Sequence, residues 1–475
     1  AWHAGASVVL VDGALTPMQM DAAIRSAAPD HLVGIDRALV AARALRWPVG
    51  RFLVGDDTRR ARLADPAARV GKVGHPGPGG QPAPGTHESG NGRPTVDDEA
   101  AVVFTSGSTG PSKGVRYAHG PLMAQRDAVR ARYGIGPDDR LVAAFAPFAL
   151  FGPVLGIPSA VPDMDVSSPG TLTAAALADA VAAVDATLVF GSPAALANVV
   201  ATAGALDAPQ RAAFEPVRMV LSAGAPVRVP LLTAAAELLG ADQAHTPYGM
   251  TECLPVADIE LAEIRRATGG DGVCVGRPLA GGEVLVRPLG PRGEVVSDDT
   301  DAAGVVGEIV VRAPHLRSGY DRLWHTEYLA AQPLGGHATG DVGAFDDLGR
   351  LWVGGRVQHL ITTAAGLVLP VGAEHRIAEL DDVELAAVVG VGPVGAQQPV
   401  AVCVRRGVVR ARIAAPDLAD AVRAAAGVEL AAVIEVSGLP VDRRHNSKID
   451  RTRVAAWADV QLSGRRPSPL RWRRP

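Results

Sequence analysis

The chain contains the stretch Val102-Val103-Phe104-Thr105-Ser106-Gly107-Ser108-Thr109-Gly110-Pro111-Ser112-Lys113-Gly114. Its apolar, β-branched start predicts a strand, and the small residues that follow predict a tight loop ending at a lysine. Small residues let backbone N–H groups approach phosphate oxygens, hydroxyls add donors, and a lysine adds positive charge. A helix predicted from about His119 would point its N-terminus at the same anion. A flexible surface loop is the alternative, but the strand and the single lysine favour a phosphate site.

This loop differs from the common Gly-x-x-x-x-Gly-Lys-Ser/Thr nucleotide loop, because Ser112 precedes Lys113 and Gly114 follows it. It resembles the phosphate-binding loop of the adenylate-forming superfamily, which includes acyl-CoA synthetases, luciferases and the adenylation domains of peptide synthetases. The resemblance implies that ATP binds to Thr105, Ser106, Gly107, Ser108, Thr109, Gly110 and Lys113.

Length and composition favour a globular enzyme. A chain of 475 residues has room for two or three domains, and a net charge of -4 gives no nucleic-acid signature. No apolar run approaches the roughly 20 residues of a membrane helix. The three cysteines lie far apart, so a disulfide framework or a zinc site is not expected and a reducing cytoplasm is the expected location. The chain starts at Ala1, and the resemblance implies that further N-terminal residues precede it.

The N-terminal part alternates predicted strands, at 7–11 and 31–35, with predicted helices, at 18–28 and 37–46. This alternation indicates a layered α/β domain with parallel strands. Residues 71–98 are rich in proline and glycine and are predicted to be a disordered surface loop. The same alternation of strands and helices returns between residues 173 and 240.

A second motif spans residues 245–252. A tyrosine ring offers adenine a packing surface, a threonine hydroxyl suits a phosphate, and a glutamate carboxylate suits Mg²⁺. A buried tyrosine with a capping glutamate is the structural alternative. The motif resembles the superfamily's Tyr-Gly-x-Thr-Glu signature, which implies nucleotide binding by Tyr248, Gly249 and Met250, a catalytic role for Thr251 and Glu252, and metal binding by Glu252.

Three further elements complete the nucleotide site that the resemblance implies. A predicted strand at 218–221 is followed by Gly224, Ala225 and Pro226, which resemble the element that lines the adenine pocket. Ligands commonly bind at such carboxyl ends of parallel strands. Asp341 is expected to accept both ribose hydroxyls, and Arg356 is expected to contact ribose or phosphate.

Residues 146–153 place Phe148 and Phe151 in an apolar loop. Two aromatic side chains there suit a wall of an acyl pocket, although an ordinary core contact explains them equally well. Asp163 and Asp165 suit a turn better than a metal site.

The fold class expected is α/β: a large N-terminal domain of layered sheets and helices at 1–356, and a small, mobile α+β domain at 357–462. Residues 463–475 form a basic tail. Near the end, residues 439–451 resemble the superfamily's closing lysine loop, which implies that Lys448 is catalytic. A lysine there can bridge the substrate carboxylate and the α-phosphate while charge develops.

The implied reaction is attack of a carboxylate on the α-phosphate of ATP, assisted by Mg²⁺. Gln358 and the residues after it differ from the acyl-CoA synthetase hinge, whereas residues 147–153, 161–165, 245–249 and 441–449 resemble the β-lactone synthetases of bacterial olefin biosynthesis. That branch adenylates a long-chain 2-alkyl-3-hydroxy acid in fatty acid metabolism, and the hydroxyl then closes a β-lactone.

Two alternatives to β-lactone synthesis stay open: a fatty acyl-CoA or acyl-AMP ligase, and a non-catalytic nucleotide-binding homologue. By motif position alone, His119 and His245 are candidate acceptors of the hydroxyl proton. The resemblance also implies two pathway partners, a reductase that forms the hydroxy acid and a β-lactone decarboxylase.

Overall fold

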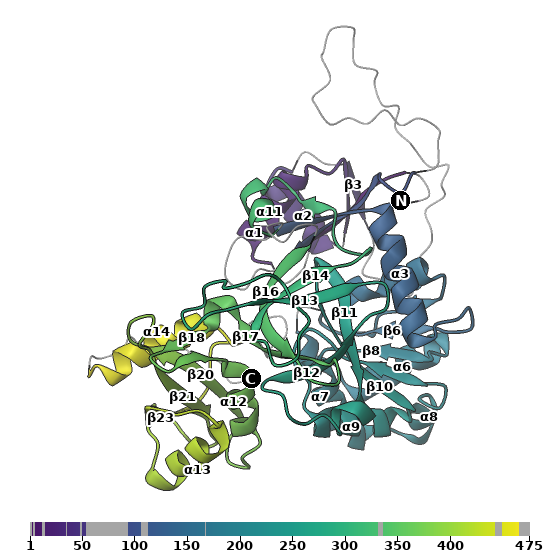
Figure 1. Cartoon of the computed structure of the whole chain (residues 1–475). Helices are drawn as coiled ribbons and strands as arrows, with labels where there is room; N and C mark the ends of the chain where they lie inside the picture. The colour runs from purple at the N-terminus through teal and green to yellow at the C-terminus, as the bar shows by residue number, and fades with distance from the viewer. Residues whose placement is uncertain are drawn as a thin grey trace, which may run out of the picture.

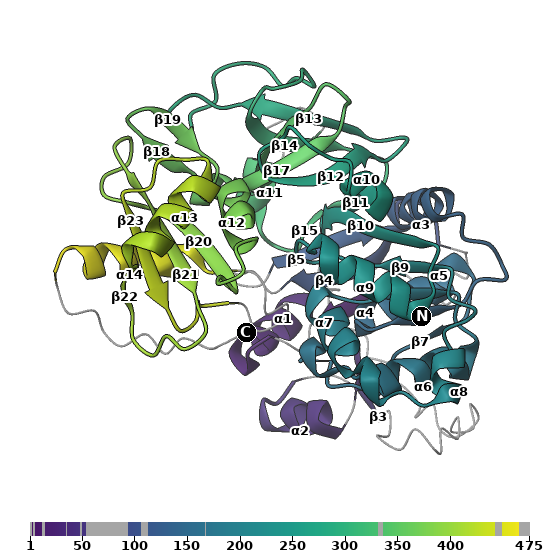
Figure 2. The same ribbon diagram turned by 90° about the horizontal axis from the view of Figure 1, so that it is seen from below.

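The computed structural model describes residues 2, 5–11, 15–34, 36–47, 50–53, 94–105, 113–166, 168–330, 336–441 and 449–464. A large group of sheets and helices is built from the chain up to β17, and a smaller group follows it along the chain (Figure 1). Seen from below, the smaller group packs beside the larger one (Figure 2). None of the helices in the described part combines the length and the apolar composition that a membrane-spanning segment requires.

The N-terminal part has parallel strands, as predicted. Strand β1 (Val8–Val11) runs parallel to β4 (Glu99–Thr105), and β2 (His31–Gly34) runs parallel to β3 (Gly50–Leu53). Helix α1 (Pro17–Ala27) packs apolar residues against β4, and α2 (Asp36–Ala44) connects β2 to β3. The four-stranded sheet is completed, in the order β1-β4-β5-β15, by β5 (Lys113–Ala118) and β15 (Gly319–Tyr320).

The central sheet has 11 strands, of which one part is parallel and the other antiparallel. Its parallel part, from one edge inward, consists of β7 (Ser159–Ala160), β6 (Leu141–Ala143), β8 (Leu188–Phe190), β9 (Met219–Leu221) and β10 (Gln243–Met250). Its antiparallel part continues with β11 (Cys253–Glu260), β12 (Val273–Pro278), β17 (Leu351–Arg356), β16 (His337–Phe345), β14 (Gly307–Arg312) and β13 (Glu283–Pro288).

Side-chain alternation explains why helices cover both faces of the parallel strands. Val142, Val189 and Val220 face a core formed with α6 (Ala174–Val184), α7 (Pro193–Thr202) and α9 (Val229–Leu239). Their neighbours along the same strands face the opposite core, formed with α3 and α5. The helices on that second side and the remaining short helices are α3 (His119–Tyr133), α4 (Ala146–Ala149), α5 (Phe151–Leu155), α8 (Ala208–Ala212), α10 (Leu261–Ile264) and α11 (Trp324–Ala330).

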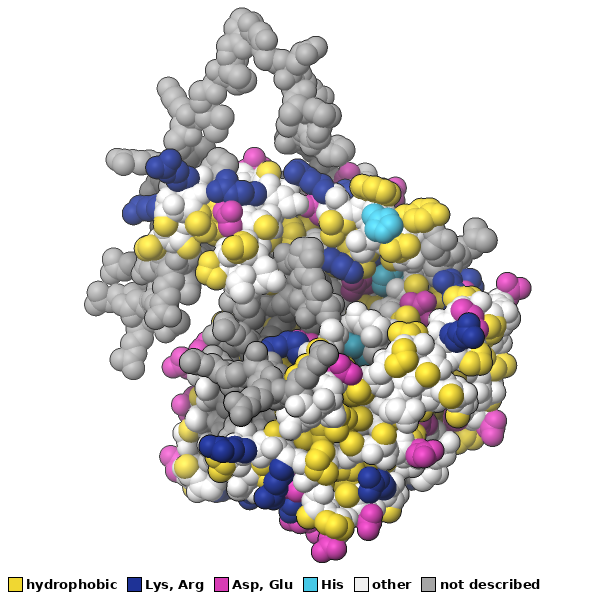
Figure 3. Space-filling view, turned by 90° about the vertical axis from the view of Figure 1, so that its left-hand side faces the viewer, with side chains coloured by type: hydrophobic (Ala, Val, Ile, Leu, Met, Phe, Trp, Pro, Cys, Tyr) yellow, Lys and Arg dark blue, Asp and Glu magenta, His cyan; other side chains and the backbone are white. Residues whose placement is uncertain are grey.

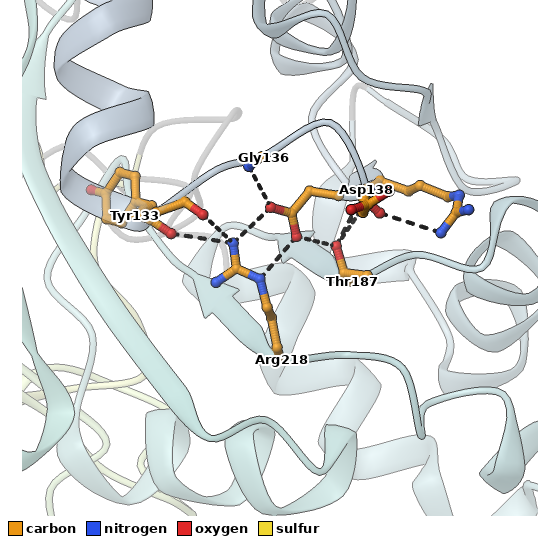
Figure 4. A network of polar contacts seen from close by, with 8 residues as sticks. Tyr133, Gly136, Asp138, Thr187 and Arg218 are labelled. Atoms are coloured by element: carbon orange, nitrogen blue, oxygen red, sulfur yellow. Dashed lines mark hydrogen bonds and ion pairs between the residues drawn. The ribbon is translucent and has the colours of Figure 1, made fainter.

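A buried carboxylate ties together the amino ends of three parallel strands (Figure 4). Asp139 accepts two hydrogen bonds from the Arg218 guanidinium, at 2.8 and 2.9 Å, and one from the Thr187 hydroxyl at 2.7 Å. Hydrogen bonds from Arg218, Thr187 and the Gly136 N–H outweigh burial and hold the pKa of Asp139 at about 2. This network lies at the strand ends opposite to those that ligands use in such sheets, so it is structural.

The smaller group is a four-stranded sheet in the order β20-β21-β23-β22. Ala386 and Val388 face α12 and α13, whereas Ala387 and Val389 face α14, because successive side chains of a strand point to opposite faces. The sequence predicts regular elements at 399–404, 418–425 and 432–436, and all three are present, as two strands and a helix. The elements are β18 (Ile361–Thr363), β19 (Gly366–Val368), α12 (Pro370–Ala378), β20 (Leu385–Val391), β21 (Gln398–Val404), β22 (Arg412–Ile413), α13 (Pro416–Ala426), β23 (Ala432–Val436) and α14 (Arg451–Leu462).

Two local expectations were wrong. The N-terminus of α3 does not point at the predicted phosphate loop, because β5 pairs antiparallel with β4 and carries the chain back: Thr105 pairs with Lys113, but Glu99 pairs with Ala118. Six residues of strand move His119 roughly 17 Å from the loop. The resemblance to the superfamily implies a turn at Gly319 and Tyr320, but these two residues form β15, because the free edge of β5 offers backbone partners at Arg116 and Val115.

Candidate active site

Three residues that the sequence predicts for nucleotide binding meet directly. The Tyr248 hydroxyl donates to Oδ2 of Asp341 at 2.8 Å, and Nε of Arg356 donates to Oδ1 at 3.0 Å. Desolvation and the neighbouring Asp341 charge raise the pKa of Tyr248, so its hydroxyl remains a donor. Tyr248 lies on β10 and Asp341 and Arg356 pair across β16 and β17, so the tertiary structure joins three segments here.

An irregularity in β16 accompanies this placement of Asp341. Between the pairs Glu308–Val342 and Val310–Ala338, Thr339, Gly340 and Asp341 lie opposite Ile309 alone. Gly340 has φ +75, a conformation that glycine adopts without strain. The Thr339 hydroxyl donates to the Ile309 carbonyl and accepts from the Asp341 N–H. Bulges of this kind re-aim side chains beside active sites.

The turn between β10 and β11, which carries Thr251 and Glu252, is held from several sides. The Tyr117 hydroxyl donates to the Thr251 carbonyl, and the Arg317 N–H donates to the Glu252 carbonyl at 2.8 Å. The Gln125 side-chain amide donates to the Leu254 carbonyl. Thr251 and Glu252 therefore sit on a backbone that is fixed by neighbouring elements.

The Glu252 carboxylate and the Lys113 ammonium group both lie close to Tyr320. The Tyr320 hydroxyl donates to Oε1 of Glu252 at 2.7 Å, and Nζ of Lys113 lies 5.7 Å from the centre of the Tyr320 ring. The Arg317 guanidinium lies 4.0 Å from the same centre. Burial, then the Glu252 charge, raise the pKa of Tyr320, so the hydroxyl remains a donor to the carboxylate.

Sequence reasoning missed several residues in this region. Arg317, Glu327 and His337 carry no motif, and only their packing around Glu252 and Tyr320 reveals them. His337 is 3% exposed, and its Nδ1 has no hydrogen-bond partner among the described residues. Burial is the main reason that the pKa of His337 falls to about 4. The charges of Arg317 and Lys113 lower the pKa further, whereas those of Glu252 and Glu327 raise it. The imidazole is therefore neutral at pH 7.

The predicted acyl-pocket residues belong to an aromatic cluster at the carboxyl ends of β6 and β8. Phe148 stacks on Phe190 with ring centres 4.2 Å apart and an interplanar angle of 6°. Phe145 and Phe151 contact Phe148 with ring centres 5.2 and 5.3 Å away. The cluster packs on the core beneath it while Phe148 and Phe151 stay half-buried. The geometry is compatible with a pocket wall and with a core contact.

The remaining predicted residues fall into two sets. Gly224, Ala225 and Pro226 follow the carboxyl end of β9, beside β10, and Gly224 has φ +96. Thr105 ends β4 and Lys113 begins β5. Outside the described residues lie Ser106, Gly107, Ser108, Thr109, Gly110 and Lys448, together with 71–93 of the predicted loop and 465–475 of the predicted tail.

The two histidines considered as proton acceptors lie in structural settings. His245 is buried, and its Nδ1 lies 2.8 Å from Oδ2 of Asp258. Asp258 also accepts from Arg132 at 2.8 Å and from the Tyr133 hydroxyl at 3.1 Å, so this network joins α3 to β10 and β11. His119 begins α3 at the end of β5 that lies away from Lys113.

Within the described residues, no group of three or more histidine, cysteine, aspartate or glutamate side chains could hold a metal ion. Mg²⁺ is usually held by one or two carboxylates together with substrate phosphates and water. The single carboxylate of Glu252, held by the Tyr320 hydroxyl, fits that pattern and does not fit a metal site built from protein ligands alone.

Residues 1–321 match the AMP-binding enzyme family. The chain is 37% identical to olefin beta-lactone synthetase of Xanthomonas campestris pv. campestris, over 97% of this chain and 83% of that protein. Identity to the olefin beta-lactone synthetase of Stenotrophomonas maltophilia is 35%, over 97% and 84%.

Solved structures share the fold. The amide bond synthetase McbA from Marinactinospora thermotolerans superposes with a TM-score of 0.71 at 26% identity, covering 96% of this chain and 85% of that one. The O-succinylbenzoate coenzyme A synthetase from Bacillus subtilis, solved with ATP and a magnesium ion, gives 0.69 at 20% identity, covering 94% and 83%. The chain therefore belongs to the AMP-binding enzyme family and is an ATP-dependent, AMP-forming ligase that activates a carboxylate.

Proposed function

We propose that the protein is a β-lactone synthetase that adenylates a long-chain 2-alkyl-3-hydroxy acid and then closes the ring with release of AMP. The observation that carries this proposal is the 37% identity to an olefin beta-lactone synthetase over 97% of the chain. The residues that meet in the candidate site fit the first half of the reaction. The aromatic cluster around Phe148 suits an alkyl chain.

In the first step, the substrate carboxylate attacks the α-phosphorus of ATP and pyrophosphate leaves. Tyr248, Asp341 and Arg356 would bind the nucleoside, and the loop at 105–110 with Lys113 would bind the phosphates. Mg²⁺, when bound, would neutralise phosphate charge, with Glu252 as its carboxylate ligand. Positioned donors of this kind typically contribute about 10²- to 10³-fold each to the rate.

In the second step, the substrate's 3-hydroxyl oxygen bonds to the adenylated carbonyl carbon, and the bond from that carbon to the phosphate oxygen breaks. AMP leaves with the bonding electrons and the hydroxyl proton passes to a base. The nucleophile belongs to the substrate, so proximity contributes up to about 7–11 kcal/mol in well-oriented cases. No external acceptor is needed, in keeping with the departure of Gln358 from the acyl-CoA synthetase hinge.

We further propose that residues 1–356 and 357–462 act as two domains, with Lys448 delivered to the acyl phosphate by the second. The described residues supply one supporting feature: the buried clusters that contain Ala386 and Ala387 are formed by residues after 360 alone, so this part has its own core. A reductase that makes the hydroxy acid and a decarboxylase that consumes the lactone are the partner enzymes that the proposed pathway requires.

The test is to incubate the protein with ATP, Mg²⁺ and a synthetic long-chain 2-alkyl-3-hydroxy acid without CoA, and to analyse the organic extract by NMR. We expect a β-lactone and an equal amount of AMP. The matched 2-alkyl acid without the 3-hydroxyl should give adenylate and pyrophosphate but no lactone. Acyl-CoA as the dominant product when CoA is added would contradict the proposal and favour an acyl-CoA ligase.

A further inference from the structure

Helix α11 carries a carboxylate that organises the surroundings of Glu252. Oε2 of Glu327 accepts from Nη1 of Arg317 at 2.7 Å and from the backbone N–H of Tyr320 at 2.9 Å. Tyr320 in turn donates its hydroxyl to Glu252 at 2.7 Å, and the Arg317 N–H donates to the Glu252 carbonyl at 2.8 Å. One carboxylate on α11 thus fixes Arg317 and Tyr320, which each donate a hydrogen bond to Glu252.

The burial of the participants makes this arrangement sensitive to charge. The Arg317 side chain is 5% exposed, and its Nε finds no hydrogen-bond partner in the part of the chain that the structure describes. Its flat guanidinium lies over the Tyr320 ring. Glu327 is the acidic side chain that forms an ion pair with it. A buried arginine that loses its partner carries an uncompensated charge, which favours a new ion pair with a nearby carboxylate such as Glu252.

We propose that Glu327 is a positioning residue that, through Arg317 and Tyr320, keeps the Glu252 carboxylate oriented and free of a protein counter-ion for the metal-bound phosphates of ATP. The inference rests on the proposed role of Glu252 toward Mg²⁺. Glu327 does two things here: it holds the Arg317 charge away from Glu252, and it places the Tyr320 hydroxyl against Oε1. Outer groups that orient a ligand carboxylate commonly change metal affinity about 10- to 100-fold when they are removed.

The tyrosine adds orientation without adding charge. A phenol that remains protonated can only donate to the carboxylate, so it fixes the rotation of the Glu252 carboxylate and leaves its negative charge in place. Arg317, in contrast, would neutralise Glu252 if it turned away from Glu327. The geometry therefore predicts that loss of Glu327 harms metal-dependent nucleotide binding more than loss of the Tyr320 hydroxyl does.

The experiment measures the equilibrium dissociation constant of ATP by calorimetry, once with Mg²⁺ and once with EDTA, for the full chain. The ratio of the two constants is the metal enhancement. E327Q and Y320F are compared with E252Q as reference. E263Q serves as the control, because Glu263 also pairs with an arginine, Arg277 at 2.8 Å, and has no part in the site.

We expect the EDTA constants of all variants to stay within about twofold of the wild type. The metal enhancement should fall about tenfold in E327Q, less in Y320F and not at all in E263Q. In the double variant E327Q/E252Q, no loss beyond that of E252Q is expected, because Glu327 acts through Glu252. A purely structural role of Glu327 would change both constants together and leave their ratio alone.

Three outcomes would overturn the inference: a wild-type enhancement in E327Q, an additive loss in the double variant, or a wild-type enhancement in E252Q. If Y320F folds and E327Q does not, Y320F alone decides whether the hydroxyl orients Glu252. None of these outcomes depends on the product formed. Absence of β-lactone from a wild-type protein that binds Mg²⁺ and ATP would refute the proposed function and leave this inference standing.

Discussion

The substitution Asp341→Asn tests the nucleotide end of the site. Asp341 accepts from the Tyr248 hydroxyl at one oxygen and from Arg356 at the other. Each carboxylate oxygen keeps a second lone pair, so both can also accept ribose hydroxyls. Asparagine leaves one acceptor oxygen and no charge. Loss of one hydrogen bond to a charged group costs about 1.5–3 kcal/mol, which is roughly a 10- to 150-fold weaker affinity for AMP and ATP.

The assay is the dissociation constant of AMP, which needs no metal and no chemistry. Asp299→Asn is a matched control: like Asp341, Asp299 has a side chain that is 14% exposed and pairs with an arginine, Arg287 at 3.1 Å. Asp299 lies outside the candidate site, so its variant should bind AMP like the wild type while losing a similar amount of stability. Equal AMP affinity in Asp341→Asn and Asp299→Asn would refute the assignment of Asp341 to the ribose.

Three further predictions follow from other parts of the structure. His337 has a pKa of about 4 in the folded protein against 6.5 in the unfolded chain, so between these pH values the unfolded state binds the extra proton. The free energy of unfolding should therefore fall as pH drops from about 6.5, by up to about 3 kcal/mol, and level off below about 4. A flat difference in thermal midpoint between wild type and His337→Gln across that range would contradict this prediction. Phe148→Ala removes the stack on Phe190 and should lower the free energy of unfolding by up to about 3 kcal/mol. It should also shift the preferred acyl length, measured as AMP release from acids of increasing length. An unchanged preference would assign Phe148 to the core alone. Arg376→Ala removes an exposed ion pair to Asp271, worth up to about 1 kcal/mol, and three hydrogen bonds to carbonyls at the end of α13. Amide hydrogen exchange along α12 should therefore accelerate. Unchanged exchange would show that α12 docks by apolar contacts.

The distribution of charged side chains on the surface does not by itself identify the candidate site. On the face in Figure 3, lysine and arginine side chains are interspersed with aspartate and glutamate over the described residues. No feature of the composition marks the acidic and basic residues that matter, since Glu327 and Glu263 look alike along the chain. Their different neighbours, Arg317 beside the site and Arg277 outside it, separate them.

The sequence by itself determined the alternation of strands and helices, the motif around Tyr248 and Glu252, and the family, because these depend on local periodicity and on short, ordered motifs. The run Asp-Asp-Leu-Gly-Arg at 346–350 predicts a hairpin turn, and Ser192 before Pro193 predicts a helix cap. Both are present, since both rest on hydrogen bonds between residues close in the chain. Each of these features is complete within a few consecutive residues.

The tertiary structure alone decided where those motifs meet. Strand β5 pairs antiparallel with β4 and so carries the N-terminus of α3 away from Thr105 and Lys113, a pairing between strands that satisfies their backbone groups. The bulge at Thr339–Asp341 aimed a carboxylate at Tyr248 from 93 residues away in the chain. Arg317 and Glu327 acquired their place around Glu252 only by packing. Contacts between distant segments depend on strand pairing and burial, and no local pattern in the sequence encodes them.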